Sequence, residues 1–219
     1  MDREAARFTI KFVKRYGLYL NLVGCRLSER LPEYQLNMES NMRSIEIELV
    51  PVQRMHKQAL HRGKQHLEQL LGVSVPEGWP TFPEALALSE EEPTEPTRWP
   101  AYFFVCPKKG ALVGNGGFAA PPDAHGPNEQ EEVEIGYEVA TEYRNLGYAT
   151  AAAKAMLALA FSRPEVNAVV AHTLAEKNAS TAVLQKLGMS LVGELPNAEV
   201  GKVWKWCIQR PFPSIESPM

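Results

Sequence analysis

The sequence predicts a mixed α/β (α+β) fold, and two observations support this fold class. Several short segments alternate apolar and polar residues with a period of two, which is typical of strands half-buried in a sheet. Other segments have helical periodicity, so that the second half of the chain reads as strand, helix, strand, helix and two strands. The chain has 219 residues, of which 45% are hydrophobic, and this is enough for a core.

The charge and the cysteine content exclude several classes of protein. The 23 Lys and Arg residues are balanced by 26 Asp and Glu residues, which argues against general nucleic-acid binding. The chain has no run of about 18 apolar residues, so we expect no membrane span. Cys25, Cys106 and Cys207 lie far apart and form neither a disulfide framework nor a metal-spaced pair. We therefore expect a cytoplasmic protein with no bound metal.

The basic N-terminal segment has two interpretations. One is a targeting segment, because Lys and Arg residues precede the apolar stretch 16–23. Asp2, Glu4 and the lack of a small-residue cleavage site argue against targeting. The other is an N-terminal extension over residues 1–41, either poorly ordered or the product of an upstream start.

The domain itself is expected to cover residues 42–212, followed by a tail over 213–219. Residues 44–50 alternate Ile and Leu with Glu, which predicts the first strand. Residues 51–71 then have the pattern of a helix. An irregular segment rich in Pro and Glu follows over residues 73–100.

A run of strands comes next. Ala101–Cys106 and Ala111–Ala119 are joined by residues 107–110, a short link that ends in glycine and is typical of a hairpin turn. Residues 121–128 predict a loop, and residues 133–139 a further strand. One face of this last strand carries Glu132, Glu134, Gly136 and Glu138, and the other carries Val133, Ile135, Tyr137 and Val139.

The rest of the chain alternates between helices and strands. An alanine-rich segment of high helix propensity begins at Gly147 and extends to Pro164. Residues 166–173 predict a buried strand. The second helix covers residues 178–187, with Asn178 as its N-cap. The last two strands cover residues 189–195 and 202–209.

The turn that opens the alanine-rich helix is the part of the sequence that points to chemistry. A helix N-terminus presents unsatisfied N–H groups and the positive end of a dipole, which together attract anions. Gly147 and Ala149 are small enough for an anion to approach the backbone, and Arg144 adds a guanidinium suited to phosphate. The segment therefore predicts a phosphate-binding turn. The alternative is a tight strand-to-helix turn with a solvated arginine.

With its surrounding sequence, this turn resembles a known family. Arg144-x-x-Gly147-x-Ala149 matches the (Arg/Gln)-x-x-Gly-x-(Gly/Ala) signature of the GCN5-related N-acetyltransferase (GNAT) superfamily. The other matching elements, in the order of the family, are residues 134–139 before the turn, and Asn178-x-Ser180 and residues 186–189 after it. The whole pattern resembles the ribosomal-protein-alanine acetyltransferase branch, and it covers the chain from about Met42 to Gln209.

The resemblance implies both a fold and an activity. The fold is a mostly antiparallel central sheet, splayed at the cofactor site and flanked by helices. The activity is transfer of an acetyl group from acetyl-CoA, the co-substrate, to a primary amine of a small molecule or a protein N-terminus. The amine attacks the thioester directly. The sequence leaves the oligomeric state open between a monomer and a homodimer. A non-catalytic acyl-CoA-binding module is the alternative.

The resemblance also assigns residues to the co-substrate. The diphosphate lies beside Arg144 on the backbone amides of Asn145, Leu146, Gly147, Tyr148 and Ala149. The pantetheine arm lies along the strand end formed by Glu138, Val139 and Ala140. Asn178 binds this arm, and Ser180 lies nearer the phosphates. For Asn178 and Ser180, plain helix capping is the alternative interpretation.

Acetyl transfer to an amine needs a base and a donor for the developing oxyanion. An ammonium group with a pKa of about 10.4 must lose a proton before it attacks the thioester. Glu134 is our first choice for the base, and the resemblance places the Val139 N–H at the oxyanion. Glu138 lies on the same face of the strand as Glu134. Four strand residues separate the two carboxyl groups by roughly 13 Å, which is too far for a glycosidase-style carboxylate pair. The alternative for Glu134 is a solvent-facing glutamate.

One position departs from the pattern of the family. Many members have a tyrosine four residues before the final helix glycine, where it protonates the leaving thiolate. This chain has Leu184 at that position. Either another acid replaces the tyrosine, or solvent does, or no donor is needed. His172 and Tyr148 are the candidates for another acid.

Two further patterns need an interpretation. The glycine-rich segment 114–119 imitates a dinucleotide fingerprint, but Pro121 and Pro122 prevent the helix that such a site requires. We therefore interpret this segment as a glycine-rich strand or bulge and reject a dinucleotide oxidoreductase. Trp79 and Trp99 either line an acceptor pocket or belong to the core.

Overall fold

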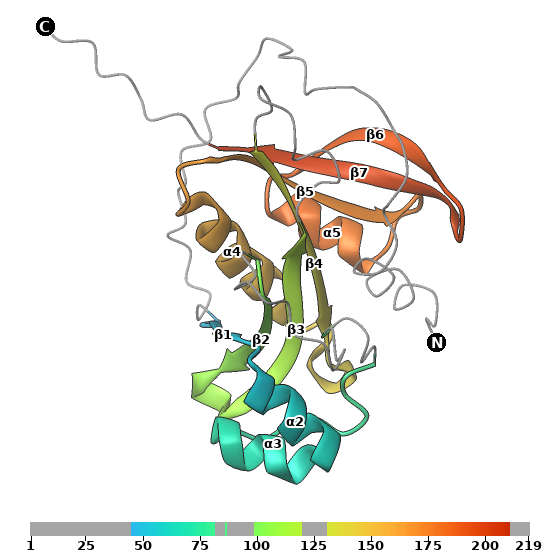
Figure 1. Cartoon of the computed structure of the whole chain (residues 1–219). Helices are drawn as coiled ribbons and strands as arrows, with labels where there is room; N and C mark the ends of the chain where they lie inside the picture. The colour runs from blue at the N-terminus through green and yellow to red at the C-terminus, as the bar shows by residue number, and fades with distance from the viewer. Residues whose placement is uncertain (1–44, 82–85, 87–98, 120–130, 211–219) are drawn as a thin grey trace, which may run out of the picture.

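The computed structural model describes residues 45–81, 86, 99–119 and 131–210, and these residues form the mixed α/β fold that the sequence predicts. Seven strands of the described part make one twisted sheet, in the order β1-β2-β3-β4-β5-β7-β6 (Figure 1). Neighbouring strands in this sheet run antiparallel, except for the parallel pair β4 and β5. The sheet is thus mostly antiparallel, as the family resemblance implies.

The elements follow one another in the order that the sequence indicates. The strands are β1 (Glu48–Pro51), β2 (Ala101–Cys106), β3 (Ala111–Ala119), β4 (Glu131–Val139), β5 (Val166–Leu174), β6 (Ser190–Asn197) and β7 (Gly201–Gln209). The α-helices are α2 (Arg54–Arg62), α3 (Lys64–Leu71), α4 (Tyr148–Phe161) and α5 (Ala179–Lys186). Two short 3-10 turns are η3 (Pro107–Lys109) and η4 (Thr141–Tyr143).

The first strand and helices differ in detail from the expectation. β1 begins at Glu48 and includes Pro51. Proline has no backbone N–H to donate, and an edge strand such as β1 tolerates this because it is hydrogen-bonded to a neighbour on one side only. The single helical stretch expected over residues 51–71 is wrong, because it is two helices. Gly63 separates α2 from α3 with φ 118°, a backbone conformation that other residues rarely adopt.

Several expectations lie outside the described residues. These are the extension at 1–41, Ser44 of the first strand, most of the irregular segment 73–100, the loop 121–128 and the tail 213–219.

The two faces of the sheet pack against different helices. α4 and α5 cover one face, where Val133 and Ile135 of β4 share a core layer with Met156 of α4. On the opposite face, Phe103 of β2 shares a second core layer with Leu67 of α3. Because successive strand residues point to opposite faces, the glutamates of β4 lie on the face away from α4 and α5.

β4 and β5 separate part of the way along their length. Residues 131–134 of β4 pair with residues 166–170 of β5, and the pairing then ends. Beyond that point β4 stays paired with β3 as far as Val139, and β5 stays paired with β7 as far as Leu174. The sheet is therefore splayed between β4 and β5, which leaves an opening with a strand edge on each side.

The β4 edge of this opening presents the peptide groups of Tyr137 and Val139. Ala140 donates its backbone N–H to the Val113 carbonyl oxygen of β3 at 2.9 Å. In an antiparallel pair the peptide groups alternate in direction, so the even-numbered residues of β4 point theirs toward β3. The odd-numbered residues Tyr137 and Val139 point their N–H groups toward the opening.

The glycine-rich segment 114–119 belongs to β3, and its glycines allow β3 to approach β4 closely. A Cβ atom at Gly114 would lie 2.2 Å from the carbonyl oxygen of Glu138. At Gly116 it would lie 2.5 Å from the carbonyl oxygen of Gly136. Both contacts are with backbone, so a side chain at either position would push the two strands apart.

We expect Gly114→Ala to lower the free energy of unfolding by about 1–3 kcal/mol, the usual cost of overpacking a well-packed site. Gly193→Ala is the matched control, because Gly193 lies in β6 and a Cβ there has no atom within 4 Å. The control should change stability by no more than about 0.5 kcal/mol. Chemical denaturation of both variants measures the difference, and equal stabilities would contradict the close approach.

Candidate active site

The turn between β4 and α4 leaves the N-terminus of α4 open at the surface. Asn145 has φ 60° and Gly147, the N-cap, has φ 89°, a conformation that these two residue types tolerate. The turn residues 144–147 are exposed, and among the described residues no side-chain hydrogen bond caps the N-terminus of α4. The N–H groups of a first helical turn without a cap attract anions. The turn that the sequence singles out is thus exposed at the start of α4, and the phosphate site there stays a prediction.

Arg144 connects this turn to the end of β4. Its Nε donates a hydrogen bond to the Val139 carbonyl oxygen at 3.0 Å. Arg144 is nevertheless exposed at the surface, three residues before Gly147, the N-cap of α4. The sequence predicted the charge at this position but not the hydrogen bond, which depends on how the turn folds back on the strand.

The side chains of the turn divide between surface and core. Leu146 is 58% exposed, whereas Tyr148 is buried and packs edge-on against Tyr143, with ring centroids 5.4 Å apart. Burial raises the pKa of the Tyr148 hydroxyl. The Tyr148 ring therefore belongs to the core beneath the turn, and its backbone is the part that the turn presents.

Asn178 caps helix α5, as the sequence predicts. Its Oδ1 accepts a hydrogen bond from the Thr181 N–H at 3.0 Å, and the Thr181 hydroxyl pairs with the backbone of Asn178. Ser180 lies in the first turn of the same helix and is partly buried. Because β4 and β5 are parallel, Asn178 after β5 lies at the same end of the opening as the turn after β4.

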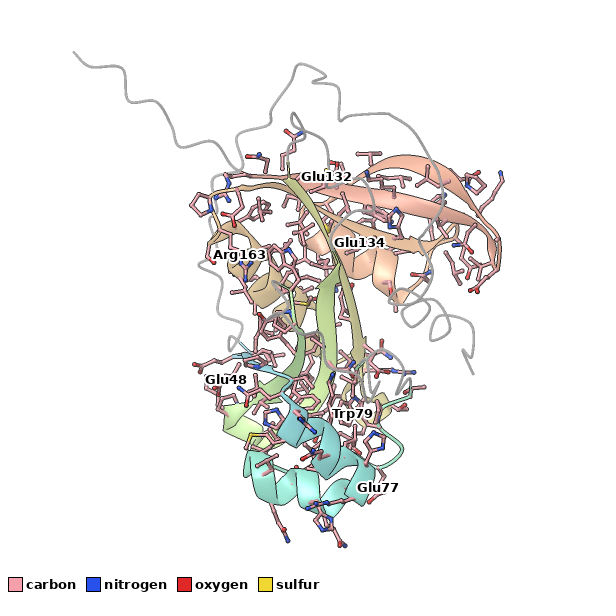
Figure 2. The ribbon with its side chains drawn as sticks, viewed as in Figure 1. Glu48, Glu77, Trp79, Glu132, Glu134 and Arg163 are labelled. Carbon is pink, nitrogen blue, oxygen red and sulfur yellow. The ribbon has the colours of Figure 1, made fainter. Side chains whose placement is uncertain are left out.

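Glu134 and His172 meet where β4 and β5 separate. His172 Nδ1 lies 2.5 Å from Glu134 Oε1, and both side chains are largely buried, 20% and 14% exposed. A second pair lies on the same face, with Lys205 Nζ of β7 2.9 Å from Glu132 Oε2 of β4. Figure 2 shows Glu132 and Glu134 along the same strand.

The environment of Glu134 changes its affinity for a proton. Burial raises the pKa of the Glu134 carboxyl, because the charged form loses its hydration. The hydrogen bond from His172 and the charge of Lys205 act in the opposite direction, and Glu132 adds to the rise. The interpretation of Glu134 as a solvent-facing glutamate is wrong, because the side chain is only 14% exposed.

Toward the other end of β4, a buried polar pair lies beside Glu138. Trp79 Nε1 donates a hydrogen bond to Asn115 Oδ1 at 2.9 Å, and Asn115 is the neighbour of Glu138 across β3 and β4. Trp79 is 7% exposed and packs edge-on against Phe103, so it belongs to the core.

Trp99 is partly buried against the first core layer. Its ring lies 4.8 Å from that of Phe118, and the guanidinium of Arg163 stacks over it at 4.1 Å. Trp79 and Trp99 therefore both pack against the core, and most of each ring is covered by other side chains.

The residue at the position of the family's tyrosine has no polar group. Leu184 is 1% exposed and lies in the core layer between the sheet and the helices. Tyr137 of β4 packs against the same layer, and its buried hydroxyl has no hydrogen-bond partner among the described residues. Burial raises the pKa of this hydroxyl. Sequence analysis missed it because Tyr137 lies on the apolar face of β4.

The described part of the chain has neither a metal-ligating cluster nor a membrane-spanning helix. No cluster of three His, Cys, Asp or Glu side chains there is arranged to hold a metal ion. Among the helices of that part, none has the length and apolar character needed to cross a membrane.

Comparison with known proteins identifies the class of this domain. The family model described as "Acetyltransferase (GNAT) domain" matches residues 48–190, more than half of the chain. The chain therefore belongs to the GNAT family of acetyltransferases. No curated protein matches it.

Solved structures share the fold. A ribosomal L7/L12 alpha-N-protein acetyltransferase, RimL, in complex with coenzyme A is 19% identical and has a TM-score of 0.51, and the match covers 76% of this chain and 95% of that one. Aminoglycoside acetyltransferase AAC(6')-Ib in complex with coenzyme A is 15% identical with a TM-score of 0.50, covering 75% and 95%.

A third structure matches over a shorter length. The acetyltransferase (GNAT family) from Bacillus anthracis is 24% identical with a TM-score of 0.41. The match covers 50% of this chain and 65% of that one, which is slightly less than two thirds of its length.

Proposed function

We propose that this chain is an acetyl-CoA-dependent N-acetyltransferase that acts on a primary amine of a small molecule or a protein N-terminus. The observation that carries the proposal is the splay between β4 and β5, which ends at the open N-terminus of α4. An unpaired strand edge next to an exposed helix N-terminus supports the binding of an extended ligand with an anionic end. Membership of the GNAT family supports acetyl-CoA as that ligand.

In this proposal the turn and the opening hold different parts of acetyl-CoA. The backbone amides of residues 145–149 bind the diphosphate, with Arg144 beside them. The pantetheine arm lies along the β4 edge near Val139. The Oδ1 of Asn178 caps α5, so its amide Nδ2 is the group that would donate to this arm. Capping and ligand binding are thus compatible at this residue.

Bound acetyl-CoA supplies the thioester, and β4 supplies the groups that act on it. The ammonium of the acceptor has to lose a proton, and Glu134 is the carboxylate on which this step depends. The Val139 N–H, at the edge of the opening, would donate to the oxyanion that develops on the acetyl carbonyl. Both residues belong to β4 but lie five positions, or roughly 16 Å, apart. In this proposal, water in the opening would carry the proton from the amine to Glu134.

One observation favours a second function. Leu184 at the place of the family's tyrosine fits a module that binds acyl-CoA without catalysis, because its buried side chain offers no proton. Measuring CoA release with acetyl-CoA and a panel of primary amines separates the two functions. The enzyme releases CoA with at least one amine, whereas the module binds acetyl-CoA and releases none.

We expect Gly147→Glu to weaken acetyl-CoA binding by more than about tenfold, or about 1.4 kcal/mol, because a carboxylate would compete with the diphosphate for the helix N-terminus. Gly188→Glu is the matched control. Gly188 also has positive φ, 79° against 89°, at the end of a helix, so both variants carry a similar backbone strain. Calorimetric titration should show wild-type affinity for the control, and wild-type affinity for Gly147→Glu would refute the placement of the diphosphate.

We expect Glu134→Gln to lower kcat by about 10²–10⁴-fold while acetyl-CoA affinity stays unchanged. In the wild type, turnover should decrease as the pH falls and Glu134 takes up a proton. Because burial raises the pKa of Glu134, this decrease should occur at a higher pH than the pKa of about 4.3 of an exposed glutamate.

Glu132→Gln is the control for this effect. This variant removes the charge of Glu132, which raises the pKa of Glu134. The decrease in turnover with falling pH should therefore occur at a lower pH, and the maximal kcat should be retained. A pH–rate profile of the three proteins measures both effects. Unchanged turnover in Glu134→Gln would remove Glu134 from the mechanism.

A further inference from the structure

The contact between Glu134 and His172 spans the opening at the point where it begins. Glu134 is the last residue of β4 that pairs with β5, and its partner is Val170. His172 lies two residues beyond Val170, on the part of β5 that has left β4. The two side chains thus reach across from opposite strands, and Nδ1 and Oε1 lie 2.5 Å apart.

When Glu134 is ionised, its contact with His172 assigns a role to each ring nitrogen. An ionised carboxylate only accepts hydrogen bonds, so Nδ1 carries the proton between it and Glu134. In a neutral imidazole Nε2 then has the free lone pair and is the basic atom. A carboxylate that holds Nδ1–H and leaves Nε2 basic is the arrangement by which acidic residues orient a catalytic histidine.

The neighbouring charged groups leave this pair intact. Lys205 lies opposite His172 in the register of β5 and β7, but its Nζ binds Glu132 at 2.9 Å. The lysine is thus engaged by Glu132, and Glu134 is hydrogen-bonded to His172. His172 retains a 20% exposed side chain, so the pair is buried but reachable.

We infer that Glu134 and His172 act as one acid–base unit in which His172 Nε2 takes the proton from the acceptor ammonium. The N–H bond of the ammonium breaks, an Nε2–H bond forms, and the positive charge moves onto an imidazolium that Glu134 stabilises. The proton then passes to water, and the imidazole is restored. This inference rests on the proposed function and refines it, because Glu134 acts on the acceptor through His172.

The test compares two roles for His172 by choosing variants that separate them. His172→Asn places an amide N–H where Nδ1–H was, so it can still hold Glu134, but it has no basic nitrogen. We expect kcat to decrease by about 10²–10⁴-fold in this variant, with acetyl-CoA affinity unchanged by calorimetry. His172→Ala should regain part of its turnover when imidazole is added to the assay, and should regain none with acetamide.

Each outcome has a distinct meaning. If His172→Asn turns over at the wild-type rate, His172 only positions Glu134 and the inference is wrong, while the proposed function stands. If imidazole fails to restore His172→Ala although that variant binds acetyl-CoA normally, the inference is also wrong. If the wild type binds acetyl-CoA but releases no CoA with any amine, the proposed function fails and the inference fails with it.

Discussion

The limited pairing between β4 and β5 is the feature on which the rest of the site depends. These two strands are parallel, and they remain in contact only over residues 131–134 and 166–170. Each is then held by its other neighbour, β3 or β7, so the opening between them is fixed from both sides. The parallel direction also brings the turn after β4 and the start of α5 to the same end.

The separation of β4 and β5 also explains why charged side chains occur between strands of the sheet. A buried carboxylate is costly unless it is paired, because burial removes its hydration. Glu134 meets this requirement through His172, and Glu132 through Lys205. The two pairs lie side by side on the face away from α4 and α5. Burial raises the pKa of the Glu134 carboxyl while His172 stays hydrogen-bonded to it, and perturbed, paired carboxyls of this kind are candidates for acid–base work.

Local features of the site could be predicted from the sequence, and contacts between distant segments could not. The alternation of glutamates on β4, the glycine at the start of α4 and the cap at Asn178 depend on neighbouring residues, and all are present. Trp79 and Asn115 are 36 residues apart, and Glu134 and His172 are 38 apart. Periodicity predicts which face of a strand is buried, but it predicts neither the neighbouring strand in the sheet nor the point where the pairing of two strands ends.

The break between α2 and α3 at Gly63 could not be predicted either, because a glycine inside a helical pattern is usually tolerated.

The hydrogen bond from Arg144 to the Val139 carbonyl oxygen makes the β4 edge chemically asymmetric. At the last residue of the strand the N–H still points into the opening, while the oxygen is already engaged. A ligand that lies there therefore meets an N–H donor beside a carbonyl oxygen that already accepts one hydrogen bond. In the proposed function, this end of β4 favours a ligand that places a carbonyl group there, as the thioester of acetyl-CoA would.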